Sequence, residues 1–110
     1  MNFKIKKDKY LNERGGSAKI IDVKCVKCGR LVLLYQKDGL GWLKRCYFNR
    51  IIEPEKYMIM HKEDKSKSLV KLDNLICICG EVIGSPFRYK DGRLSFLLRR
   101  GSFKRNVSKN

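Results

Sequence analysis

The sequence predicts a mostly β fold, a small single-domain antiparallel β-sheet structure with two cysteine knuckles. Two cysteine pairs are each followed by a glycine, in Cys25–Gly29 and in Cys77–Gly80. Short aliphatic and aromatic runs alternate with turn signals, which is typical of β-strands. The length of 110 residues fits one domain.

The first cysteine pair lies between two expected strands. Ile20–Lys24 enters the turn and Leu31–Gln36 leaves it, and both segments are rich in aliphatic residues. Asp38-Gly39 then signals a reverse turn. In Trp42–Ile52, aromatic and β-branched residues favour a strand, although the apolar positions also fit one face of a helix. We expect a strand there.

The second cysteine pair is preceded by a polar stretch. Glu53-Pro54-Glu55 is expected to end the element before it, and His61–Ser68 to form an exposed loop. Leu69–Ile76 then leads into the pair. After the turn, Ser85-Pro86 is expected to end the exit strand.

A hairpin is predicted near the C-terminus, where Asp91-Gly92 separates Phe87–Lys90 from Arg93–Leu98. The chain as a whole is expected to divide into three parts. These are a flexible basic arm (residues 1–18), a zinc-binding β domain (19–100) and a basic tail (101–110) that folding does not require.

The charge balance bears on partners rather than on the fold. Lys and Arg number 26 against 11 Asp and Glu, which gives a net charge of +15. Nucleic acid is the commonest cellular polyanion, followed by acidic membranes and acidic proteins. The alternative is a solvated basic surface without a partner.

Nothing in the sequence predicts a membrane segment or a secretory signal. The longest apolar run, Leu31–Tyr35, is too short to cross a bilayer, and residues 1–14 lack the apolar stretch of a signal peptide. We therefore expect a cytoplasmic protein. In a reducing compartment, five cysteines indicate metal ligands or reactive thiols rather than disulfides.

Four of the cysteines are predicted to bind one structural zinc ion (Zn2+). Zinc favours four ligands in a tetrahedron, and a Cys-x-x-Cys turn such as Cys25–Cys28 supplies two thiolates. The glycine that follows permits a positive φ. Lys27 offsets part of the negative charge. The second pair, Cys77 and Cys79, is one residue closer, but residues i and i+2 of a strand face the same side.

These turns resemble those of zinc-ribbon and zinc-knuckle proteins, and the whole arrangement is faintly similar to the two-knuckle β zinc fold of the Yippee and Mis18 kind. Such folds also hold one zinc between distant cysteine pairs. The resemblance covers about residues 20–100 and implies only the metal-ligand role of the four cysteines. The Cys-x-Cys second pair departs from the usual motif. In addition, residues 29–76 separate the pairs, against about 15–20 residues in a short zinc ribbon.

Other interpretations of the cysteines remain open. The four thiols can be unrelated buried side chains, and Cys-x-x-Cys can be a redox motif, although an aliphatic strand rather than a helix follows it. Cys46 is expected to pack in the core and His61 to be solvated. Each is an alternative zinc ligand.

We expect no enzymatic activity. Four thiolates close the zinc shell and leave no place for water. A single histidine and the lack of a phosphate-binding glycine loop provide no obvious acid–base pair. Glu63-Asp64 is most simply surface charge.

Basic residues interleaved with aromatic ones are the candidate nucleic-acid contacts. They lie around Trp42, Tyr47 and Phe48 and again after Phe96. Lys and Arg neutralise phosphates, and aromatic faces stack on exposed bases. The alternative is that the aromatic residues are core and the basic ones are their solvated neighbours. The candidates are Lys44, Arg45, Arg50, Arg93, Arg99, Arg100, Lys104 and Arg105.

The leading hypothesis is therefore a non-enzymatic, zinc-stabilised nucleic-acid-binding protein. RNA or single-stranded DNA is favoured, because no recognition-helix pattern is evident. The alternatives are a zinc-stabilised interaction module that docks an acidic protein partner, and a small-ligand pocket between sheets. The oligomeric state is not predicted.

Overall fold

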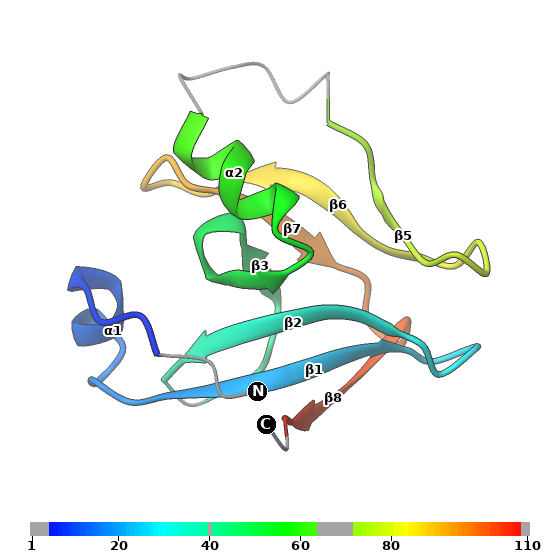
Figure 1. The fold of residues 1–110 in the computed structure, drawn as a ribbon, viewed down its shortest axis with the longest axis horizontal. Coiled ribbons are helices and arrows are strands. Elements are labelled where there is room, and N and C mark those ends of the chain that lie inside the picture. Colours follow the sequence, from blue (N-terminus) through cyan, green and yellow to red (C-terminus); the bar gives the residue numbers. More distant parts are fainter. Residues whose placement is uncertain (1–4, 40, 64–71, 109–110) are drawn as a thin grey trace.

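Two antiparallel four-stranded sheets face each other in the computed structural model, which describes residues 5–39, 41–63 and 72–108 (Figure 1). The first sheet has the order β4-β2-β1-β8 and the second the order β3-β7-β6-β5. The first consists of β1 (Ala18–Cys25), β2 (Leu31–Asp38), β4 (Ile51–Glu53) and β8 (Phe103–Val107). The second consists of β3 (Arg45–Tyr47), β5 (Leu75–Ile76), β6 (Val82–Arg88) and β7 (Leu94–Leu98). The prediction of a mostly β, antiparallel fold is confirmed.

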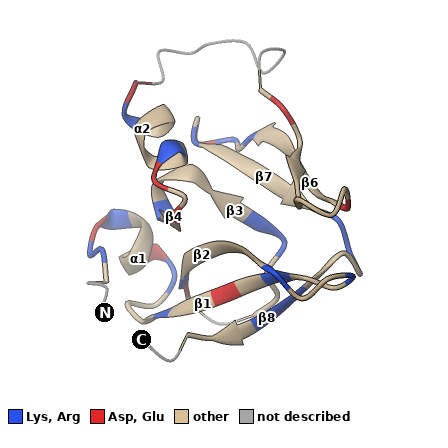
Figure 2. Cartoon of the chain, turned by 45° about the vertical axis from the view of Figure 1, so that its right-hand side comes forward, with Lys and Arg blue, Asp and Glu red and all other residues tan. Residues whose placement is uncertain are grey.

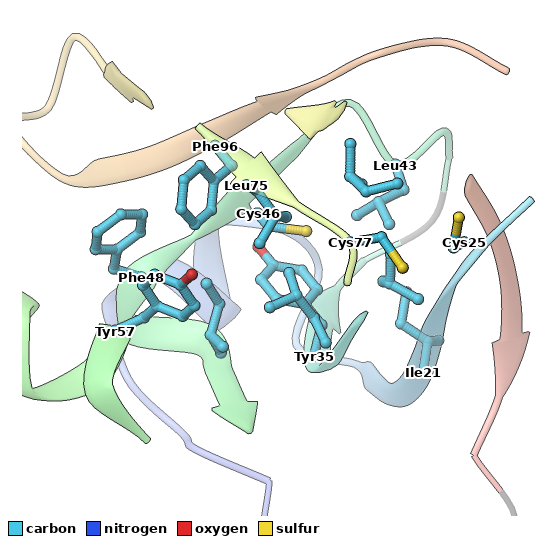
Figure 3. Packing of buried hydrophobic residues seen from close by; sticks show 14 of the residues in the cluster. Ile21, Cys25, Tyr35, Leu43, Cys46, Phe48, Tyr57, Leu75, Cys77 and Phe96 are labelled. Atoms are coloured by element: carbon cyan, nitrogen blue, oxygen red, sulfur yellow. The ribbon is translucent and has the colours of Figure 1, made fainter. Parts of the chain in front are cut away.

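The core lies between the sheets. In β1, buried residues alternate with partly exposed ones, and Val23 is fully buried. In β2, all residues from Leu33 to Gln36 are buried. At the other end of the same cluster, the ring centroids of Phe48 and Phe96 are 4.9 Å apart, and those of Phe96 and Tyr57 are 5.0 Å apart (Figure 3). Each large side chain that is fully buried contributes about 1.5–3 kcal/mol to stability.

Three short helical segments complete the described chain. They are α1 (Lys9–Glu13), the 3-10 turn η1 (Phe48–Arg50) and α2 (Lys56–Glu63). Asp8 begins α1, because its side chain accepts hydrogen bonds from the backbone N–H groups of Tyr10 and Leu11. No helix in the described ranges is long and apolar enough to cross a membrane.

The expected flexible arm is in fact partly folded onto the domain. Leu11 of α1 is buried, and the backbone of Lys6 exchanges two hydrogen bonds with the Gln36 side chain. The Asp8 carboxylate is 2.6 Å from the Arg50 guanidinium. Residues 5–14 are therefore held on the domain by a buried leucine and by polar contacts to residues far away in the sequence. The local sequence, which is mostly charged, gives no sign of these contacts.

The expected basic tail contains a strand. Phe103–Val107 forms β8 and pairs with Cys25–Ile21 of β1 in antiparallel register. Because β8 is at the edge of its sheet, most of its side chains are exposed, and its polar sequence is compatible with a strand. The prediction that this segment lies outside the fold is corrected.

Three smaller expectations also change. The segment Trp42–Ile52 is not one strand: β3, η1 and the start of β4 share it. β6 does not end at Pro86, which pairs with Phe96 of β7. The pairing of β6 with β5 includes Gly84 but not Pro86, so β5 needs no N–H group from the proline. Of the expected loop His61–Ser68, residues 61–63 belong to α2 and the remainder lies outside the described residues. The hairpin at Asp91-Gly92 is confirmed, with the Tyr89 N–H donating to the Arg93 carbonyl.

Candidate metal centre and nucleic-acid interface

The two knuckles are hairpin turns, one in each sheet. The first joins β1 to β2 and the second joins β5 to β6, and they lie one above the other at the right of Figure 1. Both use the same closing bond. The Cys25 N–H donates to the Arg30 carbonyl, and the Cys77 N–H donates to the Glu81 carbonyl, each over 2.9 Å. The second turn is one residue shorter, as its Cys-x-Cys spacing requires.

Glycine allows each turn to close. Gly29 has φ +77° and Gly80 has φ +98°, values that a side chain makes costly. The Gly29 N–H donates to the Cys25 carbonyl, and the Gly80 N–H donates to the Cys77 carbonyl. Both glycines therefore hold the cysteine backbone in a tight curve.

The sulfur atoms of Cys25, Cys28, Cys77 and Cys79 all lie within 4.8 Å of one another. The Sγ–Sγ distance is 3.6 Å from Cys25 to Cys79 and 3.4 Å from Cys28 to Cys77, so both of these contacts cross between the sheets. A tetrahedral metal with metal–sulfur bonds of 2.3 Å separates its sulfurs by about 3.8 Å. The donor set therefore fits one soft metal ion without rearrangement of the two turns.

The electrostatics at Cys25 and Cys77 bear on metal binding. Hydrogen bonds from the backbone N–H groups of Cys28 and Lys27 lower the pKa of Cys25 to about 7. For Cys77, the backbone N–H of Cys79 acts in the same direction. Burial and hydrogen bonds to neighbouring sulfurs outweigh it and raise the pKa of Cys77 to about 12. A bound cation offsets the repulsion that opposes several thiolates at such short distances.

Contacts around the knuckles join the sheets further. Lys27 of the first knuckle is 3.3 Å from the Glu81 carboxylate beside the second. The Val26 N–H donates to the Ser102 carbonyl, and the buried Ser102 hydroxyl donates to the Arg99 carbonyl. The segment between β7 and β8 thus supports the first knuckle. The surface ion pair contributes little, because Lys27 is largely exposed.

Cys46 and His61 are not part of the cysteine group. The Cys46 side chain is fully buried within the apolar cluster, where its sulfur lies apart from those of Cys25 and Cys77 (Figure 3). Burial raises the pKa of the Cys46 thiol. His61 lies on α2 and is partly buried.

The candidate nucleic-acid residues separate into internal and surface sets. Arg50 is only 2% exposed, and its guanidinium contacts the carboxylates of both Asp8 and Asp38. The Arg93 guanidinium lies 3.7 Å from the Tyr10 ring centroid and 3.9 Å from that of Tyr47 and also binds Asp91. The expectation that Arg50 binds phosphate is corrected, because its donors are already used inside the protein. The Arg93 guanidinium is likewise occupied by its contacts with Tyr10, Tyr47 and Asp91.

The surface set gathers around residues 41–44, the segment that enters β3. Figure 2 shows basic residues on this segment and on β8. Lys44, Arg100 and Arg105 line one groove with Trp42 and Phe103. Arg45 lines a second hollow, which also includes Trp42 and Lys44. Arg99 and Lys104 are exposed but do not line the groove. Lys104 and Arg105 are successive residues of β8 and therefore point to opposite faces of the sheet.

Trp42 is the aromatic residue that stands out at this surface. Its side chain is 82% exposed, in contrast to Tyr47 and Phe48, which are buried. The interpretation that Trp42, Tyr47 and Phe48 are core residues agrees with the burial of Tyr47 and Phe48 but is wrong for Trp42, which is available to a ligand. The sequence around Trp42 has no pattern that shows whether this tryptophan is exposed or belongs to the core.

No family model, no curated protein and no solved structure matches this chain. The fold and the cysteine group define a small β domain with two knuckles and a four-cysteine centre that can hold a metal ion. None of these comparisons confirms the resemblance to the Yippee and Mis18 kind of fold.

Proposed function

We propose that this protein is a non-enzymatic, zinc-stabilised domain that binds single-stranded nucleic acid, either RNA or single-stranded DNA. Zinc is the ion proposed because four thiolates in a tetrahedral arrangement are typical of structural zinc sites. The ion would be held by Cys25, Cys28, Cys77 and Cys79 and would fasten the two sheets together. The observation that carries the binding function is the groove beside Trp42.

This groove has a volume of about 690 Å³ and lies between residues 42–44, the end of β7 and the start of β8. Trp42 and Phe103 provide aromatic surface, and Leu43, Leu97 and Leu98 provide aliphatic surface. Lys44, Arg100 and Arg105 are the cations along it. Aromatic rings that stack on bases, next to cations that neutralise phosphates, are the usual elements of single-strand binding sites.

The charge around the groove is more one-sided than in the chain as a whole. Two further hollows border residues 41–44, and the three together are lined by eight basic and two acidic side chains. The complete chain has 26 basic and 11 acidic residues. The three linings thus carry a net charge of +6 (8 − 2) of the +15 of the chain, and this positive charge around residues 41–44 attracts a polyanion. The basic residues are Arg14, Lys19, Lys37, Lys44, Arg45, Arg93, Arg100 and Arg105, and the acidic ones are Glu13 and Asp38.

Single strands are favoured over duplex DNA for two reasons. Stacking on Trp42 requires unpaired bases, and the described helices have only five and eight residues. No catalytic role is proposed, because four thiolates complete the shell of a zinc ion and leave it no site for water.

The only tryptophan of the chain makes the test direct. A single strand that stacks on Trp42 should quench its fluorescence, and binding should weaken as salt is raised. The experiment titrates the protein with unlabelled oligothymidine and oligouridine at several salt concentrations, with polyaspartate as the competing acidic polypeptide.

Arg100→Gln and Arg99→Gln form a matched pair for this titration. Both side chains are exposed and adjacent, but only Arg100 lines the groove. Arg100→Gln should reduce the slope of log affinity against log salt by about 0.7, and Arg99→Gln should leave it unchanged. Failure to quench, or equal effects of the two substitutions, contradicts the proposal. Equal competition by polyaspartate favours an interaction module for an acidic protein instead.

A further inference from the structure

A second hollow, of about 320 Å³, shares one wall with the Trp42 groove. Trp42, Leu43 and Lys44 line both of them. The remaining walls come from α1, the end of β2 and the start of β3, with three tyrosines among them: Tyr10, Tyr35 and Tyr47. Its volume is at the lower end of the range for small-molecule sites. A strand lying in the groove therefore ends or turns next to a site that can take about one nucleotide.

Two residues that line this hollow each have one buried side-chain atom without a hydrogen-bond partner in the described part of the chain. These atoms are the Arg45 Nε and the Tyr47 hydroxyl. Buried polar atoms without a partner are rare, because each loses its hydration without compensation. An oxygen-rich ligand would supply the missing acceptors.

The surrounding structure holds these two donors in place. The Arg45 guanidinium lies 5.0 Å from the Tyr89 ring centroid and 5.7 Å from that of Phe87. The Tyr47 ring packs edge-on against Tyr89, with centroids 5.4 Å apart, and its backbone N–H donates to the Tyr35 hydroxyl. Donors that are fixed before the ligand arrives lose little conformational freedom when it binds.

The charge at the hollow favours an anion. Its lining has five basic residues and two acidic ones, of which the Asp38 carboxylate is already bound to Arg50 and to the Gln36 amide. The basic residues are Arg14, Lys37, Lys44, Arg45 and Arg93, and the second acidic residue is Glu13. The pKa of Lys37 is lowered, first by burial and then by the nearby charges of Arg105 and Arg14. Cations here repel one another, and this repulsion is relieved by a bound anion.

We propose that this hollow binds the terminal, phosphorylated nucleotide of a single strand whose other nucleotides lie in the Trp42 groove. A terminal phosphate carries a charge of about −1.5 to −2 and three acceptor oxygens, more than an internal phosphodiester offers. Arg45 and Tyr47 donate to this phosphate, Lys37, Lys44 and Arg14 neutralise it, and Trp42 stacks on the adjoining base. This inference rests on the proposed function and specifies which part of the nucleic acid the protein recognises.

The test compares one short oligonucleotide with a 5′-phosphate, with a 3′-phosphate and with hydroxyl groups at both ends. One of the two phosphates should raise affinity by about tenfold or more, as two hydrogen bonds to a charged group do. Equal affinities for all three oligonucleotides overturn the proposal. A free nucleoside monophosphate that binds as tightly as the phosphorylated strand identifies a mononucleotide as the ligand and overturns the strand-end assignment.

Two tyrosine variants test the assigned donor. Tyr47→Phe removes a hydroxyl that has no partner in the described structure, so the folded state should be as stable as before. The gain in affinity that a terminal phosphate gives should fall by about fivefold or more. Tyr89→Phe is the matched control. It also removes one hydroxyl, leaves the ring against Arg45 and does not line the hollow, so the gain should persist. A gain that survives unchanged in Tyr47→Phe contradicts the assignment.

Failure of the groove and failure of the hollow give different results. Without a functional groove, the hydroxyl-ended strand does not bind, and the strand-end assignment fails with the proposed function. Binding of the nucleoside monophosphate that depends on Tyr47 would then identify the hollow as a mononucleotide site. Without a functional hollow, the hydroxyl-ended strand still binds and quenches Trp42, but a terminal phosphate adds nothing.

Discussion

The buried guanidinium of Arg50 connects three segments of the chain. It lies in η1, donates to the Asp38 carboxylate at the end of β2 over 2.8 Å, and contacts the Asp8 carboxylate at the start of α1. An Arg–carboxylate cluster of this kind is costly to break, because the remaining charge is left in a poorly solvated place. Arg50 is therefore a structural residue that fixes the N-terminal segment on the first sheet.

The first prediction concerns the charge of Asp8. Hydrogen bonding to Arg50 lowers the pKa of Asp8 to about 2, below the value of about 3.9 expected in an unfolded chain. The ionised carboxylate therefore favours the folded state above pH 4, and this contribution is lost as the pH falls through about 2. Between pH 5 and pH 3, the carboxyl carbon shift of Asp8 should therefore change little.

At pH 7, Asp8→Asn should lower the free energy of unfolding by about 1–2 kcal/mol, after allowance for the solvent exposure of this carboxylate. Asp73→Asn is the control and should change it by less than about 0.5 kcal/mol. Urea unfolding of the three proteins measures both values. An Asp8 carboxyl shift that changes with a midpoint near the unfolded value of about 3.9 would show that the ion pair is absent in solution.

At the scale of the element, each knuckle is a hairpin turn whose shape is set by one glycine. The second prediction concerns Gly80, whose φ of +98° costs a non-glycine residue about 1–2 kcal/mol. Gly80→Ala should lower the melting midpoint by about 5–10 °C and should also distort the cysteine group. The distortion should appear in the visible absorption of the protein loaded with cobalt in place of zinc.

Gly92→Ala is the matched control for this experiment. Gly92 has nearly the same φ, +93°, in the β6–β7 hairpin away from the knuckles. Gly92→Ala should lower the melting midpoint by a similar amount and leave the visible absorption of the cobalt-loaded protein unchanged. Identical spectra for the two variants would mean that the second turn does not shape the metal site.

The edge strand β8 leads to the third prediction. Removal of residues 103–110 deletes five residue pairs with β1 and the half-buried Phe103, so the melting midpoint should fall by at least about 10 °C. A shorter deletion, of residues 109–110, keeps β8 and should leave the midpoint unchanged. Thermal unfolding followed by circular dichroism compares the three chains. Equal stability of all three would restore the view that this segment is a dispensable tail.

For the whole molecule, sequence patterns predicted the features that depend on local chemistry. Gly29 and Gly80 marked the two knuckles, and Asp91-Gly92 marked the hairpin. Features that depend on distant contacts could not be predicted in this way. β8 is polar because only one of its edges is paired, and no local pattern shows that Asp8 and Asp38 converge on Arg50.

The function-related residues show the same division. Cysteine spacing located all four members of the sulfur group, because two turns with paired thiols carry a local signature. The groove beside Trp42 is assembled from β7, β8 and the segment before β3, so its basic residues could not be distinguished in sequence from Arg50 and Arg93.

The cysteine centre has a mechanical role in this account, because it ties a hairpin of each sheet to the other at one end of the core. Loss of any ligand should therefore affect the whole fold, since metal binding and folding are coupled in small zinc domains. Loss of the Cys46 thiol should cost only about 1–2 kcal/mol, because it packs in the core and is not part of the sulfur group.

Native mass spectrometry of the untagged protein, purified without added metal, measures how many zinc ions each chain holds. We expect one zinc ion per chain in the wild type and in Cys46→Ser, and an unfolded, zinc-free chain for Cys25→Ser and Cys77→Ser. A well-folded wild-type protein without metal would exclude a structural zinc, and zinc that is lost in Cys46→Ser but retained in Cys77→Ser would reverse the ligand assignment.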